Sequence, residues 1–584
     1  MNKYSLVIRN GQIVDGSGAA RYVADLGIAA GRIARIAPTG AIPSSEADES
    51  IDATGLIVAP GVIDLHTHYD AQIHWDPYCT TSSWHGTTSV VVGNCGFGFA
   101  PCPPELRERY MQMMVNTEQI AYNAMRATLP WNWVTYPEWM ARLKQKTKGI
   151  NIGSYLPLNS LMMFVMGADA AKTRAATAAE RARMRALLHE AMDCGAIGFG
   201  FSHLGQMNSH KDFDGSPMPT DTMAVEEAYN LADVLRERGE GCIQALCELP
   251  GMPNRQVVEE LARRSGRPVI HNVIAVLDLM PDFHTGVMQW LDSCVARGLD
   301  IYSQALSTRV WTEFRLLEYN AWDQVPVLAE FSNCGLSVAD KLKKAGDADW
   351  RARLRSQYQP AMMVIAGGPF ESFYLHDAKA APAYEKFEGQ LLGEIAAQLG
   401  VAVTDLIFDI GIASGMLADF RTSIATSQDP DKVAAMLLHP RVLIGTSDGG
   451  AHGKFYSGGH FSTDALTWLV REEKRIGLEA MHQKLSSLPA RVLGLDRRGE
   501  LREGWAADLM IYDYERLDYT RNRYLVAHDV PGDEWRRVVP VRGIDWVVVN
   551  GQAIFRNNNC QGAVPGQVLS LSRRAHARTT AVNV

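Results

Sequence analysis

The chain has 584 residues, of which 47% are hydrophobic and 21% charged, and its formal net charge is -8. This composition is typical of a soluble globular protein and leaves room for disorder only at the ends. The charge is modest and unclustered, which argues against nucleic acid or an anionic membrane as the main partner and favours a small molecule.

The first ten residues alternate apolar and polar side chains without a long apolar run, so we expect no signal peptide. No apolar stretch reaches the length of a membrane span. The nine cysteines are odd in number and scattered. This pattern indicates reduced thiols and therefore a cytoplasmic protein.

Short strands are expected at both ends of the chain. Residues 4–13 alternate and carry an Asn10-Gly11 hairpin signal, and strands at 25–29, 32–36 and 49–58 follow. Near the other end, residues 499–513 and 546–555 carry strand and turn patterns. Neither region can bury a core alone. We therefore expect residues 1–58 and 491–559 to form one small β-sandwich, and residues 560–584 to be a tail that is mobile or docks on a neighbour.

Between these ends, short apolar strands alternate with longer helical stretches. The expected strands are 57–66, 88–95, 150–156, 196–201, 241–246, 268–273, 299–305 and 441–448, and the expected helices include 178–194, 223–238, 255–265 and 283–297. This alternation predicts an α/β fold, a (β/α)8 TIM barrel over residues 59–490. A doubly wound open sheet is the alternative, but no Gly-x-Gly-x-x-Gly follows the first strand.

The connection between the seventh and eighth strands is much longer than the others. Residues 306–440 are expected to form a helical insertion rich in Trp, Tyr and Met. Barrel active sites lie at the C-terminal ends of the strands, so an insertion there is interpreted as a lid or substrate pocket. The alternative is an oligomerisation arm, which leaves a homo-oligomer open.

His66 and His68 end the first expected barrel strand, in the stretch APGVIDLHTHYD. Residues two apart in a strand share a face, about 6 to 7 Å from each other. Zinc takes imidazole nitrogen at about 2.0 to 2.1 Å, so the pair can supply half of a tetrahedral site. A coincidental pair on a solvated edge is the alternative for so short a pattern.

Three further strand ends carry residues that can bind zinc. Cys95 lies in GNCGF after strand two, His271 in PVIHNV on strand six, and Asp448 in GTSDGG on strand eight. Each has a structural alternative: a small buried thiol, a core histidine and a turn former. Because a barrel brings all strand ends to one rim, together they indicate a metal site.

The motif order HTHYDAQ, GNCGFG, strand-six histidine and TSDGGAH, with the split β-sandwich, resembles the amidohydrolase superfamily, and within it the D-aminoacylase (N-acyl-D-amino-acid deacylase) branch. The resemblance covers nearly the whole chain, and the GNCGF cysteine is its most specific mark. It implies that His66, His68 and Asp448 bind one metal ion, while Cys95 bridges or binds a second ion with His271. The implied cofactor is Zn²⁺, one or two ions per chain.

Strand five departs from this branch. D-aminoacylases supply a histidine there, whereas this chain reads GCIQALCELP. Gln244, Cys247 or Glu248 is expected near the site, with Gln244 the one that faces inward, and His203 and His210 after strand four are the alternatives for a lost ligand. Gln244 and His203 are also expected to contact the substrate. The number of metal ions therefore stays open.

Strand six departs as well. Members of the branch carry a lysine near the substrate carboxylate two residues after the strand-six histidine, and here that position is Val273. Either Arg309, Arg421 or Lys454 takes over, or the substrate lacks a carboxylate.

The expected function is metal-dependent hydrolysis of a small-molecule amide, foremost an N-acyl (D-)amino acid. Zinc lowers the pKa of a bound water toward about 7, and Asp448 is expected to act as general base and then general acid in the attack by hydroxide. His271 and Tyr456 are candidates for an oxyanion donor, and His452 for a substrate contact. An amidohydrolase of a cyclic amide, urea, carbamate or anilide is one alternative. A non-catalytic scaffold is another, against which the presence of His66, His68 and Asp448 argues.

Overall fold

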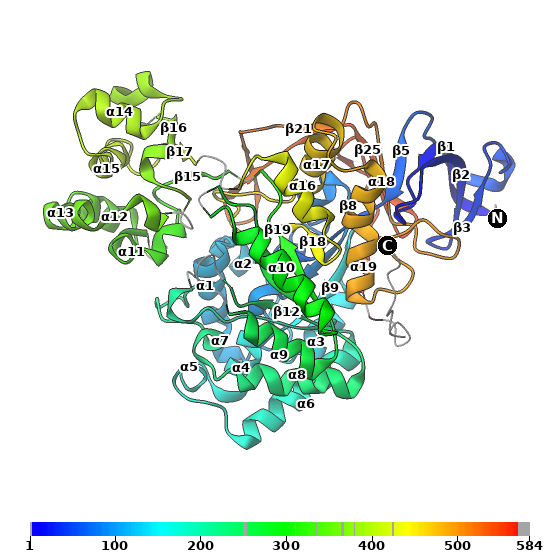
Figure 1. The fold of residues 1–584 in the computed structure, drawn as a ribbon, viewed down its shortest axis with the longest axis horizontal. Coiled ribbons are helices and arrows are strands. Elements are labelled where there is room, and N and C mark those ends of the chain that lie inside the picture. Colours follow the sequence, from blue (N-terminus) through cyan, green and yellow to red (C-terminus); the bar gives the residue numbers. More distant parts are fainter. Residues whose placement is uncertain are drawn as a thin grey trace.

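The computed structural model describes residues 3–208, 210–248, 254–278, 280–309, 311–332, 336–363, 367–378, 380–422, 426–569 and 571. Three parts follow one another across Figure 1. We call them the end sheet, built from both ends of the chain; the parallel-strand core in the middle; and the insertion, a helical lobe on the opposite side.

The end sheet joins the N-terminal and C-terminal strands. Strand β5 pairs antiparallel with β20, with Val58 opposite Ile511. The pairings of the described residues give one mixed sheet of nine strands, so the two ends do meet, but the second facing layer of the predicted sandwich is not among these pairings. Its strands are β1 (Tyr4–Ile13), β2 (Tyr22–Ala29), β3 (Arg32–Ala37), β4 (Ala47–Asp52), β5 (Ile57–Pro60), β20 (Leu509–Tyr512), β25 (Ile544–Val549), β26 (Gln552–Arg556) and β27 (Asn559–Cys560).

The hairpin turn predicted at Asn10-Gly11 is wrong. Strand β1 continues through it and stays paired with β2, with a register shift between Ile8 and Gly11. Asn10 takes a left-handed φ of 57°, and its N–H donates to Asp25 Oδ1 at 2.8 Å. The Asn-Gly pair therefore forms a β-bulge inside a strand.

The parallel-strand core contains the strands that the sequence predicts, followed by helices. They pair in parallel in three sheets, ordered β6-β8-β9, β10-β11-β12-β13-β14-β18 and β19-β7. The architecture is therefore mixed α/β. The strand pairings of the described residues do not form one continuous closed barrel. The strands are β6 (Val62–Asp64), β7 (His66–Thr67), β8 (Thr87–Val92), β9 (Asn151–Ser154), β10 (Leu156–Pro157), β11 (Gly198–Ser202), β12 (Cys242–Leu246), β13 (Val269–Ile274), β14 (Ile301–Ala305), β18 (Val442–Ile444) and β19 (Thr446–Gly449).

The first predicted strand, 57–66, divides at Gly61. Its N-terminal part belongs to the end sheet, and the chain enters the core after Gly61, whose N–H donates to Asp508 O at 2.9 Å. A Cβ at this position would lie 2.2 Å from the Thr88 side chain, so only glycine allows the approach. This crossing directs the chain toward the two histidines.

The predicted helices of the core are confirmed to within three residues. They are α6 (Ala178–Cys194), α8 (Glu226–Arg238), α9 (Arg255–Ser265) and α10 (Phe283–Ala296). Helix α6 begins at a capping box in which the Thr177 hydroxyl accepts from Glu180 N, and it ends at Gly195 in the left-handed conformation. Helix α9 buries Val258 and Leu261 toward the strands.

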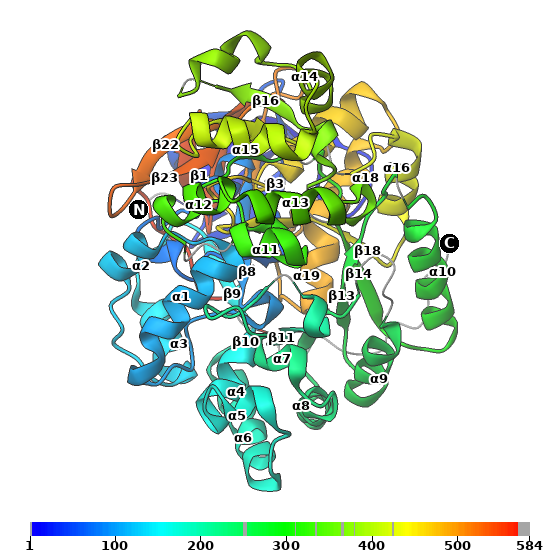
Figure 2. The same cartoon turned by 90° about the vertical axis from the view of Figure 1, so that its left-hand side faces the viewer.

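The insertion has its own aromatic core, in which Phe314, Trp322, Trp350 and Phe408 are fully buried. Figure 1 shows it as a lobe beside the parallel strands, and in Figure 2 the same helices face the viewer. Its elements are β15 (Glu313–Arg315), α11 (Pro326–Ser332), α12 (Val338–Ala345), α13 (Ala348–Gln357), β16 (Tyr374–Asp377), α14 (Leu392–Leu399), α15 (Val403–Ala413) and β17 (Asp419–Arg421). Helix α16 (Pro430–Leu438), inside the expected range 306–440, packs instead with the main core.

Part of the predicted tail docks on its own chain. Gly566 N donates to Lys148 O at 2.8 Å, and Leu569 N donates to Ile152 O at 2.7 Å, alongside β9. Arg573, Arg574 and Arg578 lie outside the described residues.

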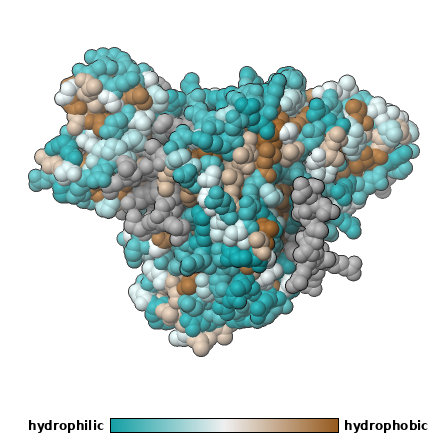
Figure 3. Space-filling view, in the orientation of Figure 1, coloured by the Kyte–Doolittle hydropathy of each residue, from teal (hydrophilic) through white to brown (hydrophobic). Residues whose placement is uncertain are grey.

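The surface in Figure 3 is mostly hydrophilic, with small apolar groups over the insertion and the end sheet. In the described part of the chain, no single helix is both long and apolar enough to cross a membrane, although α14 and α15 pass as a pair bent by 95°. The cysteines of the described ranges are all free thiols.

Candidate active site

The turn after β8 aims a thiol at the core. Gly93, Cys95 and Gly96 have φ angles of 81°, 55° and 81°. A Cβ on Gly93 would lie 2.5 Å from Tyr155 O. Cys95 itself is a non-glycine residue in the left-handed region, a strain typical of functional sites. Asn94 ties the turn to β7, since its Nδ2 donates to Thr67 O at 3.3 Å.

His66, His68 and Asp448 meet because β19 pairs in parallel with β7. Asp448 Oδ1 lies 3.3 Å from His66 Nε2 and 3.8 Å from His68 Nε2. Cys95 Sγ lies 3.5 Å from the same His66 nitrogen. The structure therefore brings together four of the five predicted metal ligands.

Three of these side chains, His66, His68 and Cys95, are grouped closely enough to hold a divalent cation, and Asp448 adjoins both histidines. Ligand atoms of His66, His68 and Cys95 all lie within 4.8 Å of one another. In a tetrahedral zinc site with bonds of about 2.0 to 2.3 Å, ligand atoms are about 3.3 to 3.8 Å apart. The spacings of 3.3, 3.5 and 3.8 Å around His66 and Asp448 match this range.

Two amide side chains contact His66 on the other side of its ring, and a third, Gln244, bonds one of them. Gln304 Oε1 lies 3.3 Å from His66 Nδ1, and Asn272 Nδ2 lies 3.0 Å from the same atom. Gln244 Nε2 donates to Asn272 Oδ1 at 3.1 Å, and its Oε1 accepts from Cys95 N at 2.7 Å. Asn272 Nδ2 and a protonated Nδ1 are both donors, so with the proton on Nδ1 only Gln304 accepts from the ring, and the Nε2 lone pair is left for a metal.

The protonation states suit cation binding. Burial lowers the pKa of His66, although the Asp448 charge opposes the shift. Burial also holds the pKa of His68 well below its usual value, helped by His66, His452 and His210. Both rings are therefore neutral at pH 7, the form that binds metal. Burial raises the pKa of the Cys95 thiol well above its usual value, so this group ionises only beside a cation.

His271 does not join this cluster, contrary to the sequence prediction. Its Nε2 lies 3.0 Å from Glu248 Oε2, and its Nδ1 lies 2.9 Å from Ser303 Oγ. Its ring packs edge-on against Trp290 of α10 at 5.1 Å. Asn272, the next residue on β13, is the one that faces His66.

The predicted substrate-binding residues have different locations. Gln244 lies beside Cys95, as described above. His203 Nδ1 bonds Thr220 O at 2.7 Å, and Arg309 donates to buried Asp464 with its backbone N, Nε and Nη2. His203 and Arg309 are thus engaged in structural contacts, whereas Tyr456 and His452 lie at the site.

A small cavity of about 30 Å³ lies beside Asp448, lined by Tyr69, Tyr456 and Arg536 among others. This volume holds a water molecule. Burial raises the pKa of Tyr456 well above its usual value, so its hydroxyl stays a donor. Among the described residues that hydroxyl has no hydrogen-bond partner.

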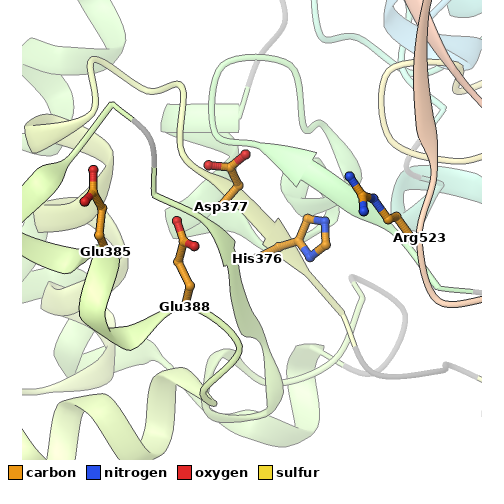
Figure 4. Close-up of a pocket in the computed structure, with 5 residues that line it drawn as sticks. All are labelled: His376, Asp377, Glu385, Glu388 and Arg523. Atoms are coloured by element: carbon orange, nitrogen blue, oxygen red, sulfur yellow. The ribbon is translucent and has the colours of Figure 1, made fainter.

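A wider hollow of about 440 Å³ lies at the insertion. Figure 4 shows His376, Asp377, Glu385 and Glu388 on the insertion side and Arg523 across from them. None of these side chains belongs to the histidine and Cys95 cluster, and their mixture of carboxylates and one arginine does not indicate a reaction. The candidate site is therefore the cluster beside Asp448.

Sequence reasoning missed Glu118, Asn272 and Gln304. The register offers a signal for two of them, since Asn272 pairs with Gln304 on neighbouring parallel strands. Glu118 ends helix α1 (Arg107–Glu118), inside a long connection that carries no motif. Nothing in the sequence marks it.

Comparison with known proteins identifies the family. The amidohydrolase family profile matches residues 49–555. The chain belongs to the amidohydrolase family. It is 26% identical over 567 residues to N-acyl-D-aspartate deacylase of Alcaligenes xylosoxydans xylosoxydans, covering 97% of this chain and 94% of that one. It is 27% identical over 564 residues to the N-acyl-D-glutamate deacylase of the same organism, covering 95% and 94%.

A solved structure shares the fold. N-acyl-D-glutamate deacylase from Bordetella bronchiseptica, complexed with zinc and a phosphonate inhibitor, superposes with a TM-score of 0.64 at 24% identity, covering 97% of this chain and all of that one. Family membership and these deacylase relatives make the protein a hydrolase of carbon–nitrogen bonds other than peptide bonds. The predicted relation to the D-aminoacylase branch is confirmed.

Proposed function

We propose that this amidohydrolase is a metal-dependent deacylase of N-acyl amino acids, with its reaction centre at the open ends of a (β/α)8 barrel. The observation that carries the proposal is the cluster of His66, His68, Cys95 and Asp448, whose ligand atoms have the spacing of a metal site. Relatives named as deacylases of N-acyl-D-aspartate and N-acyl-D-glutamate supply the substrate class.

A divalent cation held by these residues would polarise the scissile carbonyl and lower the pKa of a water molecule. Asp448 accepts a proton from the attacking water as the water oxygen bonds to the carbonyl carbon. When the carbon–nitrogen bond breaks, the same carboxyl group returns that proton to the leaving nitrogen. The Tyr456 hydroxyl, beside Asp448 and free to donate, stabilises the oxyanion that forms on the carbonyl oxygen.

A second candidate substrate class lacks a carboxylate. Two arginines that line the cavity beside Asp448 already have carboxylate partners, since Arg536 donates to Asp529 and Arg537 to Glu313. Lys454 likewise donates to Glu534. An anionic substrate would compete with these pairs. This observation favours an anilide, cyclic amide, urea or carbamate.

A substrate panel with and without metal tests both candidates. It includes N-acyl-D-amino acids, N-acyl-L-amino acids, anilides and cyclic amides, each assayed with zinc-loaded and chelator-treated protein. We expect turnover of N-acyl amino acids only with metal. Turnover restricted to uncharged amides selects the second candidate, and equal activity after complete metal removal contradicts the metal-dependent mechanism.

A further inference from the structure

A second group of polar side chains lies next to the metal ligands, and the mechanism above does not use it. Glu118 Oε2 lies 3.7 Å from His68 Nε2 and 3.5 Å from His452 Nε2. The Glu118 side chain is only 1% exposed. A backbone hydrogen bond also joins Glu118 and His452, since His452 N donates to Glu118 O at 2.6 Å.

Neither protonation state of Glu118 satisfies these contacts by hydrogen bonding. N–H···O bonds have heavy-atom distances of about 2.7 to 3.2 Å, and both imidazole nitrogens lie beyond that range. In the parts of the chain that the structure describes, Glu118 Oε1 and His452 Nδ1 have no hydrogen-bond partner. Another buried carboxylate–imidazole contact, between Glu248 Oε2 and His271 Nε2, is shorter at 3.0 Å, although His271 Nε2 also lacks a hydrogen bond among the described residues.

The surroundings of Glu118 disfavour an uncompensated negative charge. The side chain is 1% exposed, and the Asp448 carboxylate approaches the same His68 nitrogen at 3.8 Å. The carboxylate also sits on the last residue of α1, at the negative end of the helix dipole. A cation between the carboxylate and the imidazoles would offset all three effects.

The distances match those of ligands sharing an ion. Two ligand atoms at about 2.0 to 2.1 Å from one tetrahedral zinc ion are about 3.3 to 3.4 Å apart, close to the 3.5 Å between Glu118 and His452. His452 has a left-handed φ of 55°, a conformation that costs energy at a non-glycine residue.

We infer that Glu118 and His452 hold a second divalent cation beside the one on His66, His68 and Asp448, with Glu118 as the carboxylate between the two ions. The position lies away from β12 and β13, where Gln244 and Asn272 bond each other and offer amides. This inference rests on the proposed metal-dependent function.

The test is zinc stoichiometry of the full-length protein. Metal-free protein is titrated with zinc, and bound metal is measured by mass spectrometry and calorimetry. We expect two equivalents for the natural protein, and one for Glu118→Gln and for His452→Asn. Glu248→Gln, which alters the other buried carboxylate–imidazole pair, is the matched control and keeps two. Circular dichroism and thermal unfolding check that each variant folds.

Anomalous diffraction at the zinc edge gives an independent reading, with one of two peaks within bonding distance of Glu118. Saturation of the natural protein at one equivalent, or two equivalents in folded Glu118→Gln, overturns the inference. If one equivalent binds and amides are hydrolysed, the proposed function stands and only the second site fails. If no metal binds and no amide is hydrolysed, both fail.

Discussion

The two neighbouring residues His271 and Asn272 give the sharpest test of which side chain on β13 serves the metal. The perturbations are His271→Gln and Asn272→Ala, made separately. His271 faces Glu248 and Ser303, whereas Asn272 contacts His66 and Gln304. We expect the first change to alter stability and the second to alter metal affinity.

The structure sets the size of each effect. Loss of the His271 partner leaves Glu248 with Arg255, which still donates twice at 2.8 Å. The destabilisation should be about 1 to 3 kcal/mol, the cost of one lost partner in a buried pair. Loss of a side chain behind a metal ligand lowers metal affinity about 10- to 100-fold, which is about 1.4 to 2.7 kcal/mol. Asn272→Ala should fall in that range.

The assay is competition for zinc against a chelator of known affinity, with thermal unfolding of each protein measured in parallel. His271→Gln should bind zinc with unchanged affinity and melt at a lower temperature. A loss of several hundred-fold in zinc affinity for His271→Gln, with natural affinity in Asn272→Ala, would refute the assignment of faces on β13.

Three further outcomes are expected. Asp448→Asn should lower kcat by about 10²- to 10⁴-fold, the usual contribution of a general base, while the surface change Asp193→Asn leaves steady-state kinetics unaltered; comparable kcat values in the two variants would contradict the role. Arg309→Met leaves buried Asp464 without its arginine. This variant should lose about 3 to 5 kcal/mol of folding stability with no change in KM. A raised KM in folded protein would restore a substrate role for Arg309. Burial lowers the pKa of Lys484 to about 7, so the unfolded chain holds more protons than the folded protein above pH 7. Stability should therefore rise toward pH 10 by up to about 1.4 kcal/mol per pH unit. Lys484→Met should flatten this rise in a series of melting curves, and an identical slope would exclude Lys484 as its cause.

The elements of the core could be predicted from sequence because their patterns are local. Helix α9, Arg255–Ser265, was expected at those residues, since its apolar positions follow the helical period and Gly266 ends it. The Asn10-Gly11 turn failed for the opposite reason. An Asn-Gly pair supplies left-handed φ angles equally well to a hairpin or to a bulge, and pairing with β2 decides between them.

The candidate metal ligands lie on or beside β7, in the turn after β8 and on β19. They could be predicted because each belongs to a motif at the end of a strand. Glu118 could not, because its position depends on where a helix ends in space, next to the loop that carries His452. Such a contact between distant segments has no periodic signature.

The strand register explains why the prediction for His271 was wrong. In parallel strands, paired residues point to the same side of the sheet. His271 pairs with Ala245, and Asn272 pairs with Leu246. Side chains alternate along β12, so Leu246 shares the face of Gln244, the residue expected to point inward. An inward Gln244 therefore requires an inward Asn272 and turns His271 toward the helices. The side of the site formed by β12 and β13 then carries amides, which is why we infer a second ion at the carboxylate that ends α1 instead.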